Sequence, residues 1–220
     1  MYRTAFAELY GGELPPAAEA ASMAGRTDHA IALDVLELAG VPDPRAQLAA
    51  FEAALARLAP SVYGLVAESA RALPGAHAAL SALAAVPGVV QSLLTGNVRQ
   101  VAEAKLAPLG LTDHLDLDVG AYGNEHEVRA ELVPLARIRA AAGYGSDFAG
   151  VATVLVGDTP LDVAAALSTG ARAIAVATGQ FPVGELEAAG ACAVLADLTA
   201  TAELVTAVLG DRDRYQPRPA

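Results

Sequence analysis

The segment 151–162 (VATVLVGDTPLD) constrains the fold most, because an apolar run there ends abruptly in two carboxylates. The run has the length and the β-branched content of a buried parallel strand, Gly157 permits a sharp exit, and Pro160 suits the first turn of a following helix. Asp158 then stands at the carboxyl end of the strand, and Asp162 faces the same pocket. Two neighbouring carboxylates repel unless a cation such as Mg²⁺ or a shared proton offsets their charge. The segment indicates a metal site, with a turn and a helix-capping aspartate as the alternative.

Size and charge narrow the function classes. A chain of 220 residues, 54% of them hydrophobic, can bury one large core, or one core plus a small attached lobe. Its net charge of -11 and its single lysine, Lys105, argue against a nucleic-acid partner, because phosphate backbones require clustered cations. No window of eighteen apolar residues and no signal-peptide pattern is present, so we expect a cytoplasmic protein without a membrane span. The single Cys192 excludes an intrachain disulfide.

The chain changes character at Pro74-Gly75. Residues 1–73 follow a helical spacing of Ala and Leu, with helices expected at 30–38 and 44–58, and form a small helical lobe. Residues 74–210 alternate helices and strands, which builds a parallel sheet with helices on both faces. Residues 211–220, rich in charge and proline, are expected to be a frayed end.

The α/β part is expected to contain five strands. They are placed at 89–95, 115–120, 151–156, 173–177 and 193–195. The helices between and around them are placed at 76–85, 98–109, 129–142, 161–169, 184–189 and 200–209. In open sheets of this kind ligands bind beyond the carboxyl ends of the strands. Three of these strands end in polar residues there, at Thr95-Gly96-Asn97, at Asp158 with Asp162, and at Thr178-Gly179-Gln180.

The strand end at Thr95-Gly96-Asn97 leads into a helix whose first amides can receive a phosphate. The alternative makes Thr95 or Asn97 a simple N-cap. Arg99, Lys105 and Arg129 are the candidate cations for a phosphoryl oxygen. Lys105 is equally compatible with a snorkelling surface side chain, and Arg129 with a solvated ion pair to a nearby glutamate.

Taken together, the motifs at 94–97 (LTGN), 157–162 (GDTPLD) and 175–179 (AVATG) resemble the haloacid dehalogenase-like hydrolase superfamily, most closely its phosphoglycolate-phosphatase-like branch. The resemblance covers nearly the whole chain. The helical lobe looks like the small cap of that branch, residues 23–28 (MAGRTD) are similar to the segment that leads into the cap, and Pro74-Gly75 is similar to the return into the core. The resemblance implies a Rossmann-like parallel sheet with a helical cap.

The family mechanism implies an activity and a role for each motif residue. The activity is Mg²⁺-dependent hydrolysis of a small phosphorylated metabolite through an aspartyl-phosphate. Asp158 would bind Mg²⁺, and Asp162 would support or join that coordination. The hydroxyl of Thr95 would contact the phosphoryl group, together with the amides of Gly96 and Asn97. Arg129 or Lys105 would supply the positive charge of the family lysine. Arg26 would contact the substrate from the cap.

One family motif has no counterpart in these 220 residues. The family uses a first strand ending in Asp-x-Asp-x-Thr, which supplies the nucleophile and the acid/base, whereas the first aspartate here is Asp28. We expect the central first strand to be absent, the 220-residue chain to be inactive, and the parent protein to be about twenty residues longer. The alternatives are a non-catalytic phosphate- or metal-binding protein, a phosphosugar mutase and a 2-haloacid dehalogenase. Dehalogenation requires no divalent metal, so the two aspartates argue against it.

Overall fold

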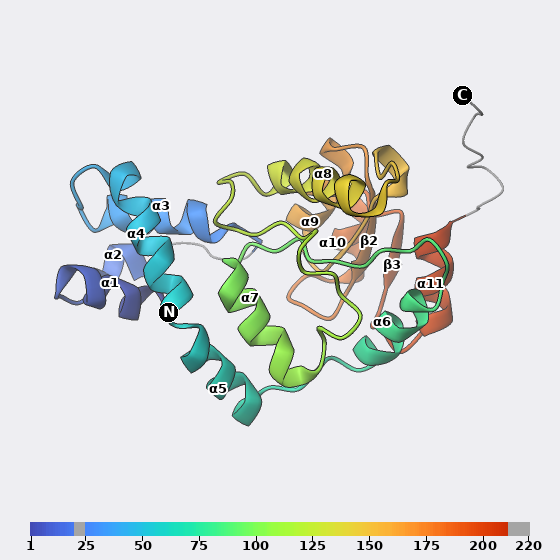
Figure 1. The fold of residues 1–220 in the computed structure, drawn as a ribbon, viewed down its shortest axis with the longest axis horizontal. Helices are drawn as coiled ribbons and strands as arrows, with labels where there is room; N and C mark the ends of the chain where they lie inside the picture. The colour runs from blue at the N-terminus through green and yellow to red at the C-terminus, as the bar shows by residue number, and fades with distance from the viewer. Residues whose placement is uncertain (20–24, 211–220) are drawn as a thin grey trace.

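The computed structural model describes residues 1–19 and 25–210 (Figure 1). Met23 and Ala24 of the segment that resembles the cap connection, and the tail expected to fray at 211–220, lie outside the described residues. The N-terminal helices gather at one end of the molecule and the sheet lies at the other (Figure 1). No helix within the described ranges is long and apolar enough to cross a membrane.

The N-terminal lobe is entirely helical in its described residues. Its helices are α1 (Tyr2–Tyr10), α2 (Pro16–Glu19), α3 (Asp28–Leu38), α4 (Pro44–Arg57) and α5 (Ala59–Ser69). Thr27 caps α3 by accepting a hydrogen bond from the Ala30 amide, and Asp43 caps α4 in the same way. The expected helices 30–38 and 44–58 are therefore confirmed. Leu36, Phe51 and Leu55 form the fully buried centre of this lobe.

The lobe extends its core into the second half of the chain. Helix α7 (Arg99–Leu106) packs against α4 and α5, and the buried Val98 and Val101 belong to the same hydrophobic cluster as Phe51. The division between residues 1–73 and 74–210 therefore stays a prediction, since this cluster spans it.

The sheet contains three parallel strands in the order β1-β2-β3 among the described residues. They are β1 (Val154–Gly157), β2 (Arg172–Val176) and β3 (Ala193–Leu195). Val154 lies opposite Arg172, and Ile174 lies opposite Ala193. The short 3-10 helix η3 (Gly150–Ala152) occupies the first part of the run expected to be a strand at 151–156.

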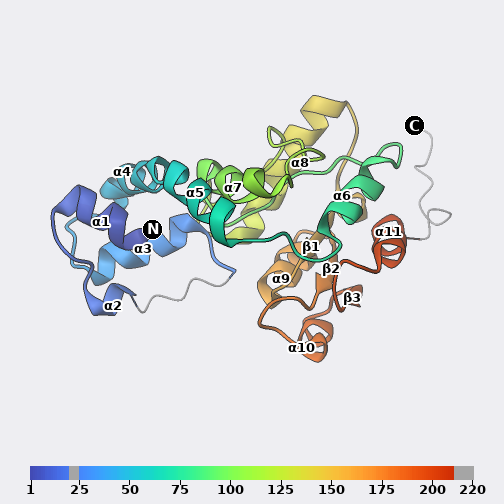
Figure 2. The same ribbon diagram turned by 90° about the horizontal axis from the view of Figure 1, so that it is seen from below.

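Helices cover both faces of this sheet, as the sequence predicts. On one face α9 (Pro160–Ser168) and α10 (Val183–Ala188) pack over Ala173 and Ala175. On the other face α6 (Ala76–Ala84) and α11 (Thr201–Leu209) pack over Ile174 and Leu195 (Figure 2). The remaining elements are η1 (Ala107–Leu109), η2 (Arg129–Glu131) and α8 (Leu132–Tyr144). The α/β class with a parallel sheet is thereby confirmed.

The strands expected at 89–95 and 115–120 are wrong as regular strands. The two segments run side by side and share an isolated parallel bridge between Leu94 and Ala121. The amide of Asp116 also donates to the Gln91 carbonyl oxygen at 2.8 Å, and the Ala121 amide to the Leu93 carbonyl oxygen at 2.9 Å. Among the described residues, the segment 89–95 pairs with another extended segment along this side alone. Pairing along one side does not hold it in a regular strand ladder. Its residues have strand composition, but the neighbour required on the other side is not among the described residues.

Candidate functional site at the carboxyl ends of the strands

The exit from β1 is organised by a capping box. Thr159 is the N-cap of α9, and its hydroxyl accepts a hydrogen bond from the Asp162 amide at 3.2 Å. The Asp162 Oδ2 atom in turn accepts from the Thr159 amide at 3.1 Å. Gly157 permits this return, because a Cβ there would lie 2.5 Å from the Asp162 side chain. Asp162 therefore fills the helix-capping role, and the exposed Asp158 carboxylate remains outside the cap.

Arg129 joins this cap to the segment that ends at Thr95. Its Nη2 atom lies 2.6 Å from Asp162 Oδ1 and 3.4 Å from the Leu94 carbonyl oxygen. The two charged side chains are only 18% and 10% exposed. The Arg129 Nε atom is buried and has no hydrogen-bond partner within the described residues. The pair thus holds two strand ends together and keeps one donor unsatisfied at their junction.

The carboxylates at this edge of the sheet could supply only part of the oxygen ligands that Mg²⁺ requires. Mg²⁺ takes oxygen ligands and is held by one or two carboxylates together with water and phosphate oxygens. Both oxygens of Asp162 are already engaged within the protein: Oδ2 accepts hydrogen bonds from Asp158 and Thr159, and Oδ1 pairs with Arg129. Asp158 fits as the carboxylate ligand, and Gly179 brings the end of β2 beside it, since a Cβ at Gly179 would lie 2.3 Å from Asp158 Oδ2. No cluster of three acidic, His or Cys side chains suited to a metal occurs in residues 1–19 and 25–210.

The strand end at Thr95 is connected to the helical lobe through Asp28. The Asn97 amide donates to Thr95 Oγ1 at 3.2 Å, and the Val98 amide donates to Asp28 Oδ2 at 2.7 Å. The Asn97 side-chain amide also approaches Asp28, at 3.4 Å. Two amides at this turn are therefore bonded within the protein, and the roles expected for Thr95, Gly96 and Asn97 toward a phosphoryl group stay predictions.

Asp28 is a site residue that the sequence reasoning missed. Its side chain is 2% exposed, and it also accepts a hydrogen bond from the Tyr2 hydroxyl at 2.5 Å. Burial and the Asp28 charge raise the pKa of Tyr2, so that this tyrosine remains protonated and a donor. The sequence placed Asp28 only in the segment 23–28 that resembles the connection into the cap, and gave it no role in the site. No spacing in the sequence connects Asp28 to Tyr2 or Asn97.

Lys105 and Arg26 lie in a separate polar cavity beside Asp28. The cavity has a volume of about 570 Å³ and is lined by Asn97, Lys105, Arg26 and Asp28 among others. Lys105 donates to Asn97 Oδ1 at 2.8 Å, and Arg26 forms an ion pair with Asp34 at 2.7 Å. The two candidates for the family lysine therefore have different places. Arg129 lies at the β1 exit and Lys105 lies behind Asn97.

Glycines allow the chain to cross closely beneath this site. A Cβ on Gly96 would lie 2.0 Å from the Arg26 carbonyl oxygen, and one on Gly123 would lie 1.6 Å from the Gly96 carbonyl oxygen. The same Gly96 oxygen accepts a hydrogen bond from the Asp28 amide at 2.6 Å. The main chains around Arg26, Gly96 and Gly123 therefore approach one another directly, with no side chain between them.

Replacing Gly96 by alanine is expected to lower the free energy of unfolding by about 2 kcal/mol, because the added methyl group must displace the backbone of Arg26. Urea denaturation measures the change. The matched control is Gly64→Ala in α5, where a Cβ meets nothing within 4 Å. That substitution is expected to stabilise the protein by about 0.5–1 kcal/mol. Equal effects of the two substitutions would contradict the close crossing at Gly96.

His29 and Glu52 form a largely buried pair of ionisable side chains deeper in the helical lobe. Nδ1 of His29 lies 2.9 Å from Oε1 of Glu52, and neither atom has a hydrogen-bond partner within the described residues. Burial lowers the pKa of His29. Burial, reinforced by the charge of Asp28, raises the pKa of Glu52 to about 7. Glu52 is therefore a carboxylic acid at mildly acidic pH.

Glu52→Gln is expected to become more stable relative to the wild type as the pH rises. The pKa of Glu52 is about 7 in the fold against 4.5 for the free side chain, so the folded protein holds the extra proton between these values. The stability this proton contributes is fully present below about pH 4.5 and is lost as the pH rises through 7. Glutamine keeps the shape and does not ionise. Urea denaturation of both proteins from pH 4.5 to 8 measures the difference, and a constant difference would contradict the assignment.

Comparison with known proteins identifies the family. The family model described as haloacid dehalogenase-like hydrolase matches residues 3–167. The chain belongs to this family of hydrolases. The resemblance inferred from the strand-end motifs is thereby confirmed at the level of the family.

Solved structures share the fold. A protein from Thermotoga maritima described as a putative beta-phosphoglucomutase aligns with a TM-score of 0.56 and 18% identity, over 93% of this chain and 88% of that one. A haloacid dehalogenase-like protein of unknown function from Agrobacterium tumefaciens aligns with a TM-score of 0.51 and 18% identity, over 95% of this chain and 90% of that one. No curated protein matches the chain. At these identities the likeness concerns the fold.

Proposed function

We propose that these residues form the metal- and phosphate-binding part of a Mg²⁺-dependent phosphomonoester hydrolase that acts on a small phosphorylated metabolite. The observation that carries the proposal is the position of Arg129. It bonds the Leu94 carbonyl oxygen and pairs with Asp162, and its buried Nε donor has no hydrogen-bond partner among the residues that the structure describes. A guanidinium with an unused donor, beside an exposed carboxylate at Asp158, suits a dianionic phosphate bound together with a cation.

The proposal divides the work among the residues at this edge. Mg²⁺ bound by Asp158 would neutralise charge that develops on the phosphoryl oxygens. Asp162 keeps Thr159 and Arg129 in place through its two oxygens. The Thr95 hydroxyl accepts from the Asn97 amide, and its own hydrogen would be donated to a phosphoryl oxygen. In the polar cavity, Lys105 and Arg26 offer positive charge to an anionic leaving group.

The nucleophile is proposed to come from outside these 220 residues. The family resemblance assigns it to the first aspartate of an Asp-x-Asp-x-Thr segment, and none occurs in the sequence. The 220-residue chain is therefore expected to bind Mg²⁺ and the phosphorylated substrate but not to hydrolyse the substrate. A version that carries an added N-terminal strand ending in Asp-x-Asp-x-Thr, called the extended chain below, is expected to be active.

The substrate class is tested by assaying the extended chain on p-nitrophenyl phosphate and on 2-chloropropionate, each with Mg²⁺ and with EDTA. Release of nitrophenol that requires Mg²⁺ supports the proposal. The control carries Asn in place of the first aspartate of the added strand and is expected to be inactive. Release of chloride without metal, or no turnover of either compound, would overturn the proposal.

A further inference from the structure

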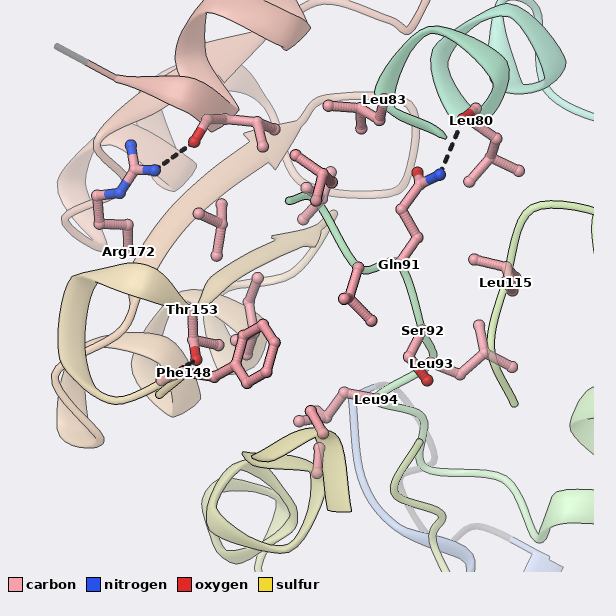
Figure 3. A pocket seen from close by; sticks show the side chains of 18 of the residues that line it. Leu80, Leu83, Gln91, Ser92, Leu93, Leu94, Leu115, Phe148, Thr153 and Arg172 are labelled. Atoms are coloured by element: carbon pink, nitrogen blue, oxygen red, sulfur yellow. Dashed lines mark hydrogen bonds between the residues drawn. The ribbon is translucent and has the colours of Figure 1, made fainter. Parts of the chain in front are cut away.

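The turn formed by residues 95–98 follows a segment that is not held in a regular strand. Residues 89–94 line one side of an apolar cavity of about 1410 Å³. Figure 3 shows Leu93 on that side of the cavity and Phe148 on the other. Among the described residues, the segment pairs with another extended segment along one side alone. Contacts from other parts of the fold are therefore required to fix the position of the turn.

Asp28, the first residue of α3, bonds this turn through both its main chain and its side chain. Its amide donates to the Gly96 carbonyl oxygen at 2.6 Å, and its Oδ2 atom accepts from the Val98 amide at 2.7 Å. The Asn97 side-chain amide approaches Oδ1 at 3.4 Å. The segment 121–123 also bonds the turn, through main-chain atoms. Asp28 thus contacts residues 96–98 in succession from the helical lobe.

The side chain of Asp28 uses both of its oxygen atoms as acceptors. Oδ1 accepts from the Tyr2 hydroxyl at 2.5 Å, and Oδ2 accepts from the Val98 amide. Burying a carboxylate is costly unless its oxygens are hydrogen-bonded, and Asp28 is only 2% exposed. Asparagine has one oxygen and would place its NH₂ group against one of these donors. The contacts at this position therefore require a carboxylate.

The side chain of Asn97 lies between a cation and an anion. Lys105 donates to its Oδ1 atom at 2.8 Å, and its Nδ2 atom approaches Asp28. The reversed amide would place the NH₂ group against the ammonium group and the oxygen against the carboxylate. Asp28 and Lys105 therefore hold the Asn97 side chain in one orientation.

We propose that Asp28 is a positioning residue for the turn 95–98. It holds the Val98 amide and the Asn97 side chain, and through them the turn that presents the Thr95 hydroxyl. The proposal rests on the proposed function, in which this turn contacts the phosphoryl group. Asp28 itself does not touch the substrate. A carboxylate of the helical lobe thereby shapes a binding turn in the α/β part of the chain.

Amide hydrogen exchange of the 220-residue chain, followed by NMR, tests this role without a ligand. Asp28→Ala removes the acceptor, so exchange at Val98 is expected to become about tenfold faster or more, with much smaller changes at Leu36 and Phe51 inside the helical lobe. The control Tyr2→Phe removes a donor to the same carboxylate and should leave exchange at Val98 unchanged. Unchanged exchange at Val98 in Asp28→Ala, or an equal acceleration at Leu36 and Phe51, would overturn the proposal.

Asp28→Asn keeps the size of the side chain and takes the place of Asp28→Ala if that variant does not fold. Its single oxygen can still accept from the Val98 amide, because the Tyr2 hydroxyl can turn and accept from the new NH₂ group. The Asn97 side chain then faces a donor where the wild type has an acceptor. Its NH₂ resonances are therefore expected to shift, while exchange at Val98 stays close to that of the wild type. Unshifted Asn97 resonances would contradict the role of the carboxylate.

In the extended chain, Asp28→Asn is expected to lower kcat for p-nitrophenyl phosphate by about tenfold or more, with a smaller change in KM, because a displaced turn misaligns the phosphoryl group. Glu37→Gln removes the same charge from the exposed face of α3 and should leave both constants unchanged. A wild-type kcat in folded Asp28→Asn would overturn the positioning role. An inactive extended wild type would instead overturn the proposed function, and the exchange measurement would still decide the role of Asp28.

Discussion

Arg129→Ala is expected to lower the free energy of unfolding by about 3 kcal/mol, the largest effect of any single substitution considered for stability. The Arg129–Asp162 contact is 2.6 Å long between side chains that are 18% and 10% exposed. Removing the guanidinium leaves Asp162 nearly buried without its cation and frees the Leu94 carbonyl oxygen. Urea denaturation measures the change in the 220-residue chain.

Two further variants distinguish the effect of burying the Arg129–Asp162 ion pair on stability from the effect of its charges alone. Arg3 and Glu19 form an ion pair of the same 2.6 Å length, but their side chains are 72% and 32% exposed. Arg3→Ala is therefore expected to cost less than about 1 kcal/mol. Arg129→Lys keeps the charge but loses the planar fork that reaches both partners, so an intermediate loss is expected. Equal losses for Arg129→Ala and Arg3→Ala would contradict the role of Arg129 at the strand ends.

Asp158→Asn is expected to reduce turnover of p-nitrophenyl phosphate by the extended chain by about 100-fold or more, which corresponds to about 3 kcal/mol of transition-state stabilisation. Asparagine keeps the size of the side chain but removes the charge that a divalent cation requires. Stability should change little, because Asp158 is exposed and stands outside the capping box of Asp162. We therefore expect Asp158 to act on turnover through the metal, and Asp162 to act on the structure through the capping box.

The control for this prediction is Asp197→Asn, a half-buried aspartate in the loop between β3 and α11. It bonds only its neighbour Thr199 in the described residues, and its loss should leave kcat/KM unchanged. Steady-state kinetics across a range of Mg²⁺ concentrations measures both variants. Full activity of Asp158→Asn at every Mg²⁺ concentration would show that this carboxylate does not hold the metal.

Local sequence signals predicted the elements that depend on local contacts. The apolar run before Gly157, the proline at 160 and the spacing of Thr159 and Asp162 fix the β1–α9 turn, and all of these contacts lie within five residues. The strands 173–177 and 193–195 were likewise predicted, from the alternation of strands and helices along residues 74–210. Their neighbours in the sheet are present in the chain, so the ladder forms.

The remaining features depend on pairings between distant residues. The segment 89–95 has the composition of a strand but has no strand partner on one side within the described ranges, so composition alone could not place it in the sheet. Arg129 was left between a solvated ion pair and a phosphate contact, and only folding brings it against Asp162, 33 positions away. The Asp28 contacts with Tyr2 and Asn97 arise in the same way, from segments whose sequences carry no shared pattern.

The intact mass of the extended chain after mixing with acetyl phosphate and Mg²⁺ tests most directly whether this edge of the sheet transfers phosphoryl groups. One phosphoryl group is expected to be gained on the first aspartate of the added strand. The gain should be absent without Mg²⁺ and strongly reduced in Asp158→Asn. An enzyme that releases phosphate without forming this adduct, or that forms it equally well in Asp158→Asn, would contradict the assignment of this edge as a metal-dependent phosphoryl-transfer site.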